Sequence, residues 1–339
     1  MEEEVFKFFK VWLIVIASLT YCYAIRRLIP KGTTAFFISW LANFKLLLLA
    51  FGKGPLSSDP SLSLPLFITV ASLPIKIQQT TPQNPPLERP KNGGTKRSTY
   101  QNVFPEKTQK SFVLNYATKG LLLAILLRVY QYKDSIHPQL LLLFQYCLIY
   151  FYLEVTLAKV ATLVRAIFAL ELEPQFNEPY LSSSLQDFWG RRWNLMVSNI
   201  LRPTVYEPVR NMFTPLIGRN CSQLSAMFAT FVVSGVMHEL IFFYLGRVKP
   251  SWEITCFFLL HGLCLVAEVA VKKVVGDKVL VPRLVSTPLS VGFVLVTGSW
   301  LFFPPLLRCN AFDRALREYA VLGALVKNAG QWFIISGGG

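Results

Sequence analysis

The chain has 339 residues, of which 53% are hydrophobic and only 16% are charged, whereas soluble domains carry about 25% charged residues. The apolar residues form blocks about as long as the roughly 20 residues that cross a bilayer as a helix, which excludes an ordinary soluble globular protein. The formal net charge is +15, but the basic residues stand between the apolar blocks and form no stripe interleaved with aromatics, so we expect no nucleic-acid partner.

Eight apolar blocks predict membrane spans along the chain. They lie at 8–25, 34–51, 62–75, 112–130, 139–163, 224–245, 253–271 and 288–306. The third block is short and contains Pro65 and Pro74, which is also compatible with a re-entrant or interfacial segment. The sequence thus predicts an all-α, polytopic integral membrane protein. It would form a single domain over 1–339, with about 7–9 transmembrane helices around an intramembrane reaction chamber.

The segment at 76–111 lies between the third and fourth blocks and is rich in Pro, Gln, Asn, Lys and Thr. Such a composition cannot bury a core, so we predict a flexible basic loop. Loops with an excess of Lys and Arg stay in the cytosol, which places this loop and the segment at 165–223 on the cytosolic side.

The segment at 171–223 is broken by five prolines and holds the densest set of Trp, Arg and Asn. Its serines from Ser182 onward predict the start of a helix, because their hydroxyls cap free backbone amides. Three apolar residues then recur at helical spacing and predict a stripe on one face, namely Trp189, Trp193 and Met196.

Two interpretations of this amphipathic or re-entrant motif segment remain open. In the first, it is an interfacial helix that Trp and Arg anchor at the headgroup level. In the second, Asn194 faces a reaction chamber and nearby guanidinium groups bind the phosphates of a nucleotide-bearing donor. The candidate guanidinium groups are those of Arg191, Arg192 and Arg202.

His238 and Glu239 lie inside an apolar block, where an ionisable side chain is costly unless it faces protein or water. Ser234 and Gly235 precede His238 by about one helical turn, and we expect them to leave room beside the imidazole. Glu239 is about 100° round the helix and is not expected to pair with His238. His238 is either a functional group or a buried histidine that another helix satisfies.

His261 is the alternative candidate, and Glu268 follows on the same predicted helix face, so that the two could pair. His137 precedes Pro138 in a short turn and is predicted to be solvated. The sequence Asn220-Cys221-Ser222 fits a glycosylation sequon, but its predicted cytosolic position argues against its use.

Other catalytic patterns are absent from the sequence: there is no GxSxG, P-loop, GxGxxG or HExxH. The six cysteines lie mostly inside apolar blocks, without a CxxC pair or a His/Cys cluster. We therefore expect no disulfide framework and no metal site.

Three stretches, at 40–48, 187–210 and 234–240, resemble the membrane-bound O-acyltransferase superfamily, and within it the plant long-chain-alcohol O-fatty-acyltransferases, or wax synthases. The resemblance implies an enzyme of the endoplasmic reticulum. It would transfer a long-chain acyl group from acyl-CoA, as co-substrate, to a long-chain fatty alcohol, forming wax ester without a further cofactor.

The same resemblance assigns roles to residues. His238 falls on the intramembrane histidine of the family and becomes the general base, Asn194 falls on its asparagine motif, and His261 becomes a helper or a packing residue. The predicted substrate contacts are Trp189, Arg191, Arg192, Trp193, Arg202 and Ser234.

Three alternatives stay open. A sterol or diacylglycerol could replace the fatty alcohol with the same chemistry. A lipid transporter would also place polar groups at mid-membrane, although no internal repeat is visible. An inactive relic is the third, because only Ala24–Lys31 joins two blocks where the resemblance implies one more span. The run Gly323–Gly339 also looks unlike the family's usual ending.

Overall fold

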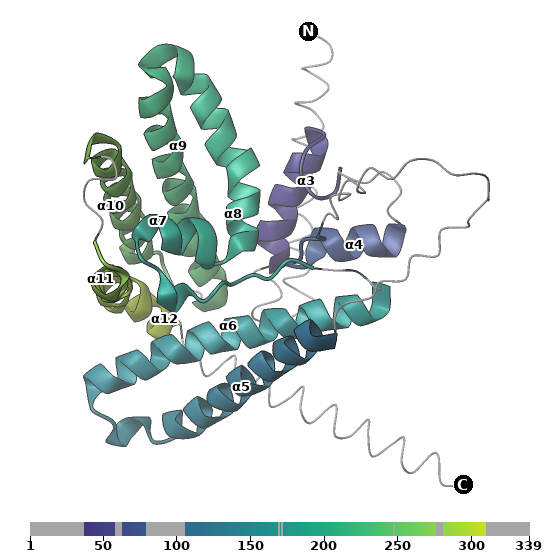
Figure 1. Ribbon diagram of the computed structural model, residues 1–339, viewed down its shortest axis with the longest axis vertical. Helices are drawn as coiled ribbons and strands as arrows, with labels where there is room; N and C mark the ends of the chain where they lie inside the picture. The colour runs from purple at the N-terminus through teal and green to yellow at the C-terminus, as the bar shows by residue number, and fades with distance from the viewer. Residues whose placement is uncertain are drawn as a thin grey trace, which may run out of the picture. The chain divides into compact units, whose positions relative to one another are not determined.

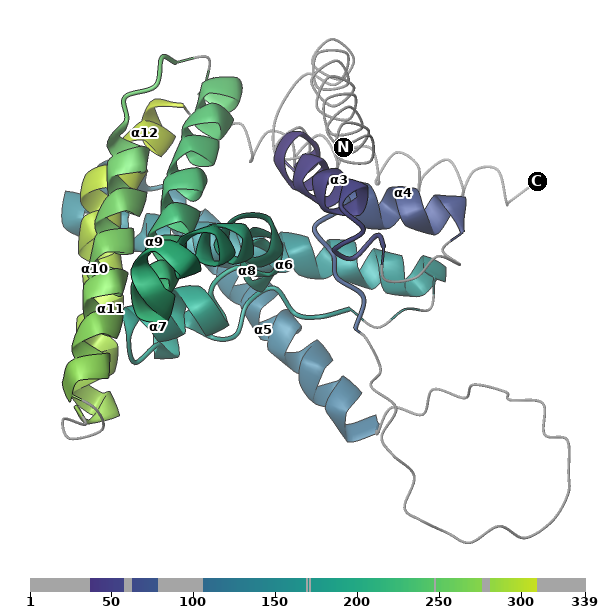
Figure 2. The same cartoon turned by 90° about the horizontal axis from the view of Figure 1, so that it is seen from above.

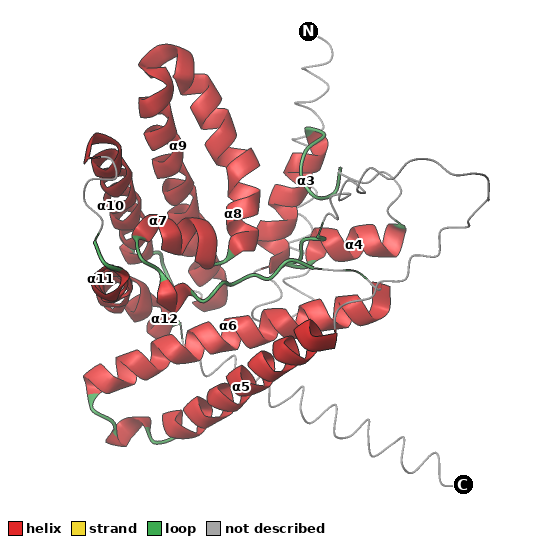
Figure 3. Ribbon diagram, in the orientation of Figure 1, coloured by secondary structure: helices red, strands yellow, loops and turns green. Residues whose placement is uncertain are grey.

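The computed structural model describes residues 37–57, 63–78, 106–168, 170, 172–246, 248–275 and 281–309. Within these ranges every regular element is a helix, and the one β pairing is an isolated antiparallel bridge between Ile77 and Leu172 (Figure 3). The all-α prediction is therefore confirmed. The predicted span at 8–25, the stretch Ala24–Lys31 and the run Gly323–Gly339 lie outside the described residues.

The smaller of two compact units covers residues 76–173, and its two described long helices form a hairpin (Figure 1). Its helices are α5 (Glu106–Tyr130) and α6 (Pro138–Phe168), joined by a short turn that contains η2 (Lys133–Ser135). A buried ion pair between Lys119 and Glu154 connects the two helices. Both predicted spans of this region, 112–130 and 139–163, are thus helical.

The predicted flexible loop at 76–111 is wrong at its C-terminal end, because α5 already begins at Glu106. The residues at 106–110 are mostly Glu, Lys and Gln, which have high helix propensity and extend the apolar helix backwards. At the other end, the amide nitrogen of Glu173 donates to the carbonyl of Lys76 at 3.0 Å, and their side chains pair at 2.9 Å. Residues 79–105 lie outside the described ranges.

The larger unit comprises residues 1–75 and 174–339. Its first described elements are η1 (Phe37–Ala42), α3 (Asn43–Ala50) and α4 (Leu64–Ser72). With 9 residues, α4 is about 14 Å long, less than half of the hydrocarbon thickness. The predicted span at 62–75 is therefore wrong as a crossing helix, because Pro65 starts the helix and Pro74 ends it.

The larger unit continues with short helical elements that lead into long helices. The short elements are η3 (Pro179–Leu181), α7 (Leu185–Asp187), η4 (Phe188–Arg192), α8 (Leu195–Leu201) and η5 (Arg202–Tyr206). The later elements are α9 (Glu207–Gly246), α10 (Glu253–Val275), α11 (Arg283–Thr297), η7 (Gly298–Phe302) and α12 (Phe303–Arg308).

Four helical segments in the described ranges are long and apolar enough to cross a membrane, and each overlaps one of the predicted spans. The segments are Leu140–Phe168, Leu195–Phe243, Glu253–Val275 and Arg283–Arg308. The second segment begins at Leu195, well before the predicted span at 224–245. This segment is not one straight helix, because Gly218 has φ 78° and ψ 166°, a conformation that glycine adopts most readily. Figure 1 shows α9 as two arms that fold back on each other at this bend.

The second arm of α9 packs against α10, and the two helices run side by side (Figure 2). Two glycines permit this close approach. A Cβ atom at Gly262 would lie 2.8 Å from the Cβ of Phe231, and one at Gly235 would lie 3.2 Å from the Cα of Thr255. The contact therefore fixes the distance between the helices that carry His238 and His261.

Candidate active site

The motif segment begins with a short, strongly bonded turn. Ser184 caps α7 by accepting a hydrogen bond of 3.0 Å from the amide nitrogen of Asp187, which confirms the predicted helix start. The Asp187 carboxylate accepts from Nε of Arg192 at 2.8 Å and from the amide of Ser183 at 3.2 Å. Burial would raise the pKa of Asp187, but these hydrogen bonds outweigh it and hold the pKa below its ordinary value.

The helix does not continue through the motif. It widens into the π-helical turn η4 and ends at Trp193, whose amide nitrogen donates to the carbonyl of Phe188 at 2.8 Å. Asn194 then takes φ 42° and ψ 63°, the left-handed conformation that Asn tolerates better than most residues. A new helix, α8, starts at Leu195.

This break makes the predicted apolar stripe wrong, because the left-handed Asn194 separates Met196 from the two tryptophans, which both contact Phe188. Trp189 packs edge-on against Phe231 with the ring centroids 5.6 Å apart. Trp193 stacks on Phe188 at 5.5 Å. Met196 is buried in a separate cluster.

The three candidate arginines have different environments. Arg191 is exposed, and Arg202 is exposed with a surface pair of 3.6 Å to Glu207. Arg192, in contrast, donates to the carboxylate of Asp187 and to the carbonyls of Asn177 and Glu178 at 3.2 Å each. The guanidinium group of Arg192 thus holds the motif turn together.

The backbone carbonyl of Asn194 accepts the amides of Val197 at 3.0 Å and Ser198 at 3.3 Å, which starts α8. Its side-chain amide makes no capping bond. Within the described residues this amide therefore remains available to another group.

His238 lies in the second arm of α9, and its Nδ1 atom is 2.7 Å from the carbonyl oxygen of Ser234. A carbonyl oxygen only accepts hydrogen bonds, so Nδ1 must carry the proton. In the neutral ring Nε2 then bears a lone pair, and none of the described residues donates a hydrogen bond to it. The arrangement leaves His238 able to accept a proton at Nε2.

Aromatic rings surround this imidazole. The Phe258 ring lies 4.4 Å from the His238 ring, centroid to centroid, and the Phe302 ring lies 6.1 Å away. The expectation that Gly235 leaves room beside the imidazole is wrong, because Gly235 instead faces the backbone of Thr255 on α10. The walls beside His238 come from α10 and η7.

His261 is fully buried, and both of its ring nitrogens are bonded. The indole Nε1 of Trp189 donates to Nδ1 at 3.1 Å, and Nε2 lies 2.8 Å from the hydroxyl oxygen of Thr297. That hydroxyl donates to the carbonyl of Phe293 at 2.7 Å, so it accepts from Nε2. His261 is therefore a neutral, satisfied histidine with no free lone pair.

The possible pairing of His261 with Glu268 is not formed. Two turns separate the residues by about 10 Å along the helix axis. The Glu268 carboxylate instead accepts from the amide of Leu185 at 2.8 Å and from Lys272 at 2.5 Å. The sequence pattern did not reveal the actual partners of His261, because Trp189 and Thr297 are distant from it in the chain.

The three sequence stretches that suggested the family resemblance meet in one buried cluster. Its members are Trp40, Leu41, Met196 and Ile200, with Met237 packed against them. Asn194 lies two residues before Met196, and His238 directly follows Met237. The cluster thus places the start of α8 beside the part of α9 that carries the histidine.

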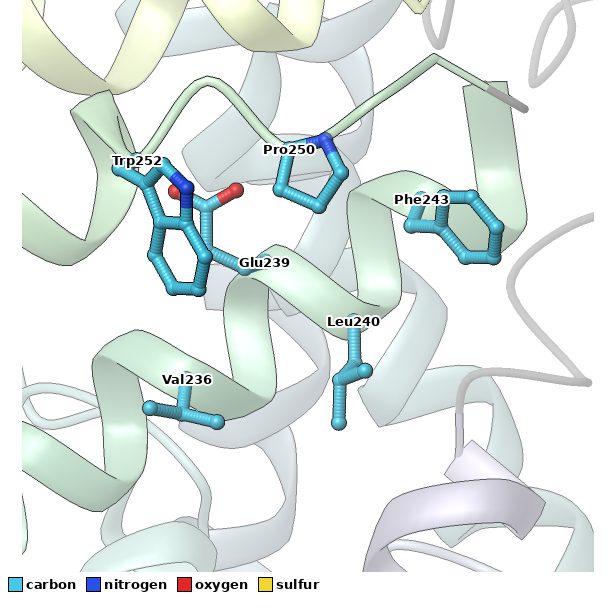
Figure 4. Close-up of a pocket in the computed structure, with 6 residues that line it drawn as sticks. All are labelled: Val236, Glu239, Leu240, Phe243, Pro250 and Trp252. Atoms are coloured by element: carbon cyan, nitrogen blue, oxygen red, sulfur yellow. The ribbon is translucent and has the colours of Figure 1, made fainter.

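A groove of about 260 Å³ opens on another face of α9 (Figure 4). It is lined by Val236, Glu239, Leu240, Phe243, Pro250 and Trp252. The Glu239 carboxylate accepts from the amide of Thr255 at 3.3 Å, which confirms that it does not pair with His238. Because His238 is not among the lining residues, this groove is not the predicted reaction chamber.

The structure also shows the surroundings of His137 and of the Asn220-Cys221-Ser222 sequon. His137 is exposed in the turn before α6, as predicted. In the sequon, Ser222 is fully buried with its hydroxyl 3.0 Å from that of Thr214, and the Asn220 side chain accepts a bond of 3.3 Å from Lys273.

Known proteins are similar to this chain both in the candidate site region and over nearly its whole length. A family model described as the membrane bound O-acyl transferase family matches residues 172–260, which contain both Asn194 and His238. Acyl-CoA–sterol O-acyltransferase 1 of Arabidopsis thaliana is 45% identical, over 94% of this chain and 95% of its own length. The long-chain-alcohol O-fatty-acyltransferase of Simmondsia chinensis is 41% identical, over 95% of this chain and 96% of its own. A probable long-chain-alcohol O-fatty-acyltransferase of Arabidopsis thaliana, number 3, is also 41% identical, over 97% of each chain. The chain therefore belongs to the membrane bound O-acyl transferase family, together with the plant long-chain-alcohol O-fatty-acyltransferases.

Proposed function

We propose that this protein transfers a long-chain fatty acyl group from acyl-CoA to a long-chain fatty alcohol, forming wax ester, with His238 as general base. The observation that carries the proposal is the tautomer of His238. Its Nδ1 proton is held by the carbonyl of Ser234 at 2.7 Å, which directs the lone pair of Nε2 away from the helix backbone.

The chemistry follows from this lone pair. An alcohol has a pKa far above neutrality and attacks a thioester poorly, so a base must remove its proton as the new carbon–oxygen bond forms. Nε2 of His238 takes that proton, the carbon–sulfur bond breaks, and the proton passes to the departing CoA thiolate. The products are the ester and free CoA, and His238 returns to its neutral form.

Asn194 is proposed to stabilise the oxyanion that develops on the thioester carbonyl. Its side-chain amide makes no capping bond, and the left-handed backbone at this residue places it, half-buried, at the start of α8. A donor of this kind acts at the point where negative charge appears in the transition state.

The acyl-CoA donor is proposed to place its phosphates near Arg191 and Arg202, which are exposed. The pair between Arg202 and Glu207 is a surface pair of 3.6 Å, which a phosphate displaces at little cost. Arg192 supports the turn through Asp187. Trp189 and Trp193 provide aromatic walls for the substrates, and Ser234 orients the base.

The proposed setting is the membrane of the endoplasmic reticulum. The acyl tail and the alcohol both partition into lipid, whereas the CoA headgroup needs water, so the reaction suits a site inside a membrane protein with basic cytosolic segments. No cofactor besides the co-substrate acyl-CoA is required by this chemistry.

A sterol acceptor is the second candidate, because the sterol O-acyltransferase relative is 45% identical to this chain. A straight alcohol and a sterol need the same proton transfer and differ in the shape of the cavity that receives them. The base and the oxyanion donor keep their roles in either case.

The test uses microsomes from a host without the activity, supplied with labelled acyl-CoA and separate pools of long-chain alcohol, sterol and diacylglycerol. Wax ester as the main product is the expected result, and its loss in His238→Ala but not in His137→Ala ties it to this site. Steryl ester as the sole product would move the assignment to a sterol acyltransferase. No ester with any acceptor would favour a transporter or an inactive relic.

A further inference from the structure

Three side chains from three elements form a directed chain of hydrogen bonds in the larger unit. The indole N–H of Trp189 in η4 donates to His261 in α10, His261 donates to Thr297 at the end of α11, and Thr297 donates to the carbonyl of Phe293. Each link has one possible direction, because an indole only donates and a carbonyl only accepts.

This chain of bonds connects the two sides of the candidate site. Trp189 belongs to the motif turn that ends at Asn194, the proposed oxyanion donor. Thr297 directly precedes η7, and η7 carries Phe302, whose ring lies 6.1 Å from the ring of His238. The Trp189 ring also lies 6.0 Å from Phe258, which covers His238 at 4.4 Å.

Hydrogen bonding of this kind is more specific than the apolar packing around it. An aromatic ring in the place of His261 could fill the same volume, but it would accept many orientations of Trp189. A buried imidazole with both nitrogens bonded allows one orientation, because any other leaves a buried donor or acceptor unpaired. His261 is fully buried and Thr297 is 6% exposed, so water does not substitute for either.

We propose that Trp189, His261 and Thr297 form a positioning relay that sets the motif turn, and with it Asn194, in register with the walls around His238. His261 and Thr297 are positioning residues here and take no part in proton transfer. This inference rests on the proposed acyl transfer and names further residues on which its rate depends.

The first test removes one hydroxyl while keeping the side-chain volume. Thr297→Val deletes the acceptor of His261, Thr297→Ser retains it, and Thr230→Val is the matched control, because Thr230 also donates to a carbonyl of its own helix, that of Met227 at 2.6 Å. In Thr297→Val, kcat should fall roughly tenfold to a hundredfold, by analogy with the loss of hydrogen-bond partners that orient metal-ligating side chains. KM for both substrates should change little, and Thr297→Ser should recover most of the rate.

The second test asks whether Trp189 and Thr297 act through one relay. Trp189→Phe keeps the ring and removes the N–H. If the relay operates, the double variant Trp189→Phe/Thr297→Val loses no more activity than the worse single variant. Losses that multiply, or a Thr297→Val enzyme as fast as Thr230→Val, would overturn the proposal.

A third measurement does not depend on catalysis. Arg191 and Arg192 follow Trp189, so trypsin cleavage in the motif turn reports its opening in the detergent-solubilised protein. Cleavage there should be faster in Thr297→Val than in Thr230→Val and Thr297→Ser, and equal rates would contradict the relay. If the unsubstituted chain makes no ester, the proposed function fails, whereas the cleavage comparison still decides the relay.

Discussion

The ammonium nitrogen of Lys45 lies 2.6 Å from the carbonyl oxygen of Val70, and the whole Lys45 side chain is buried. It also donates to the carbonyls of Leu73 at 2.6 Å and Ile75 at 3.3 Å. The carbonyls of Val70 and Leu73 lie at the C-terminus of α4, where the helix leaves acceptors unpaired and where a positive charge is favourable, and Ile75 follows just beyond it. One lysine inside an apolar helix thus fixes the end of another.

Replacing this lysine by methionine should destabilise the protein while keeping the side-chain length. Lys45→Met leaves buried carbonyls without a donor, at a cost of about 1–3 kcal/mol for each group. The thermal unfolding temperature of the solubilised protein should therefore fall, and that of Lys53→Met, an exposed control, should not. Unfolding curves that coincide for Lys45→Met and the unsubstituted protein would contradict this role.

His238→Ala should abolish acyl transfer without removing the protein from the membrane. General base catalysis typically contributes about a hundredfold to ten-thousandfold, and the free Nε2 of His238 is the base that the site offers. His261→Ala should retain part of the activity, because both nitrogens of His261 are already bonded. Ester formation at matched protein amount is the readout, and a fully active His238→Ala enzyme would refute the mechanism.

Asn194→Gly should lower kcat about a hundredfold, the usual effect of losing one oxyanion donor. Glycine accepts φ 42° without strain, so this variant removes the amide and leaves the backbone in place. Asn194→Ala should lose the same rate and be less stable as well, because the left-handed conformation costs roughly 1–2 kcal/mol for a residue with a Cβ atom. An Asn194→Gly enzyme with normal kcat would exclude the amide from catalysis.

The predicted basic loop at 76–111 and the segment at 165–223 should face the cytosol. Protease added to sealed microsomes should cut both, since Lys and Arg are retained on that side. Protection of the 76–111 loop until detergent is added would place it in the lumen and invalidate the topology.

The sequence predicted the parts of this site that depend on local pattern. The serine cap of α7 and the separation of Glu239 from His238 follow from helical geometry, and both are found. The pattern failed where tertiary contacts decide the outcome. At Asn194 a regular helix is replaced by a break, because η4 ends at Trp193, Asn194 takes φ 42° and α8 begins at Leu195, and no spacing rule indicates that.

Hydrogen bonds between residues that are distant in the sequence were the hardest to predict. In the sequence, Lys45 is only a charged residue in an apolar block. Its role becomes visible when the structure places the end of α4 beside it. Helical spacing made Glu268 one possible partner of His261, yet the actual partners of His261 are 72 and 36 residues away along the chain. Residues that are close in space but distant in the sequence leave no periodic pattern from which their contact could be predicted.

Gly262 has no side chain, and the tight packing between α9 and α10 depends on this absence. A methyl group there would lie 2.8 Å from the Cβ of Phe231, so α9 and α10 must separate to admit it. That movement would carry His238 away from Phe258, although Gly262 has no side chain that could take part in proton transfer. A survey of all substitutions scored by ester formation should therefore find alanine at Gly262 nearly as damaging as alanine at His238, and a ranking by chemical reactivity alone would overlook it.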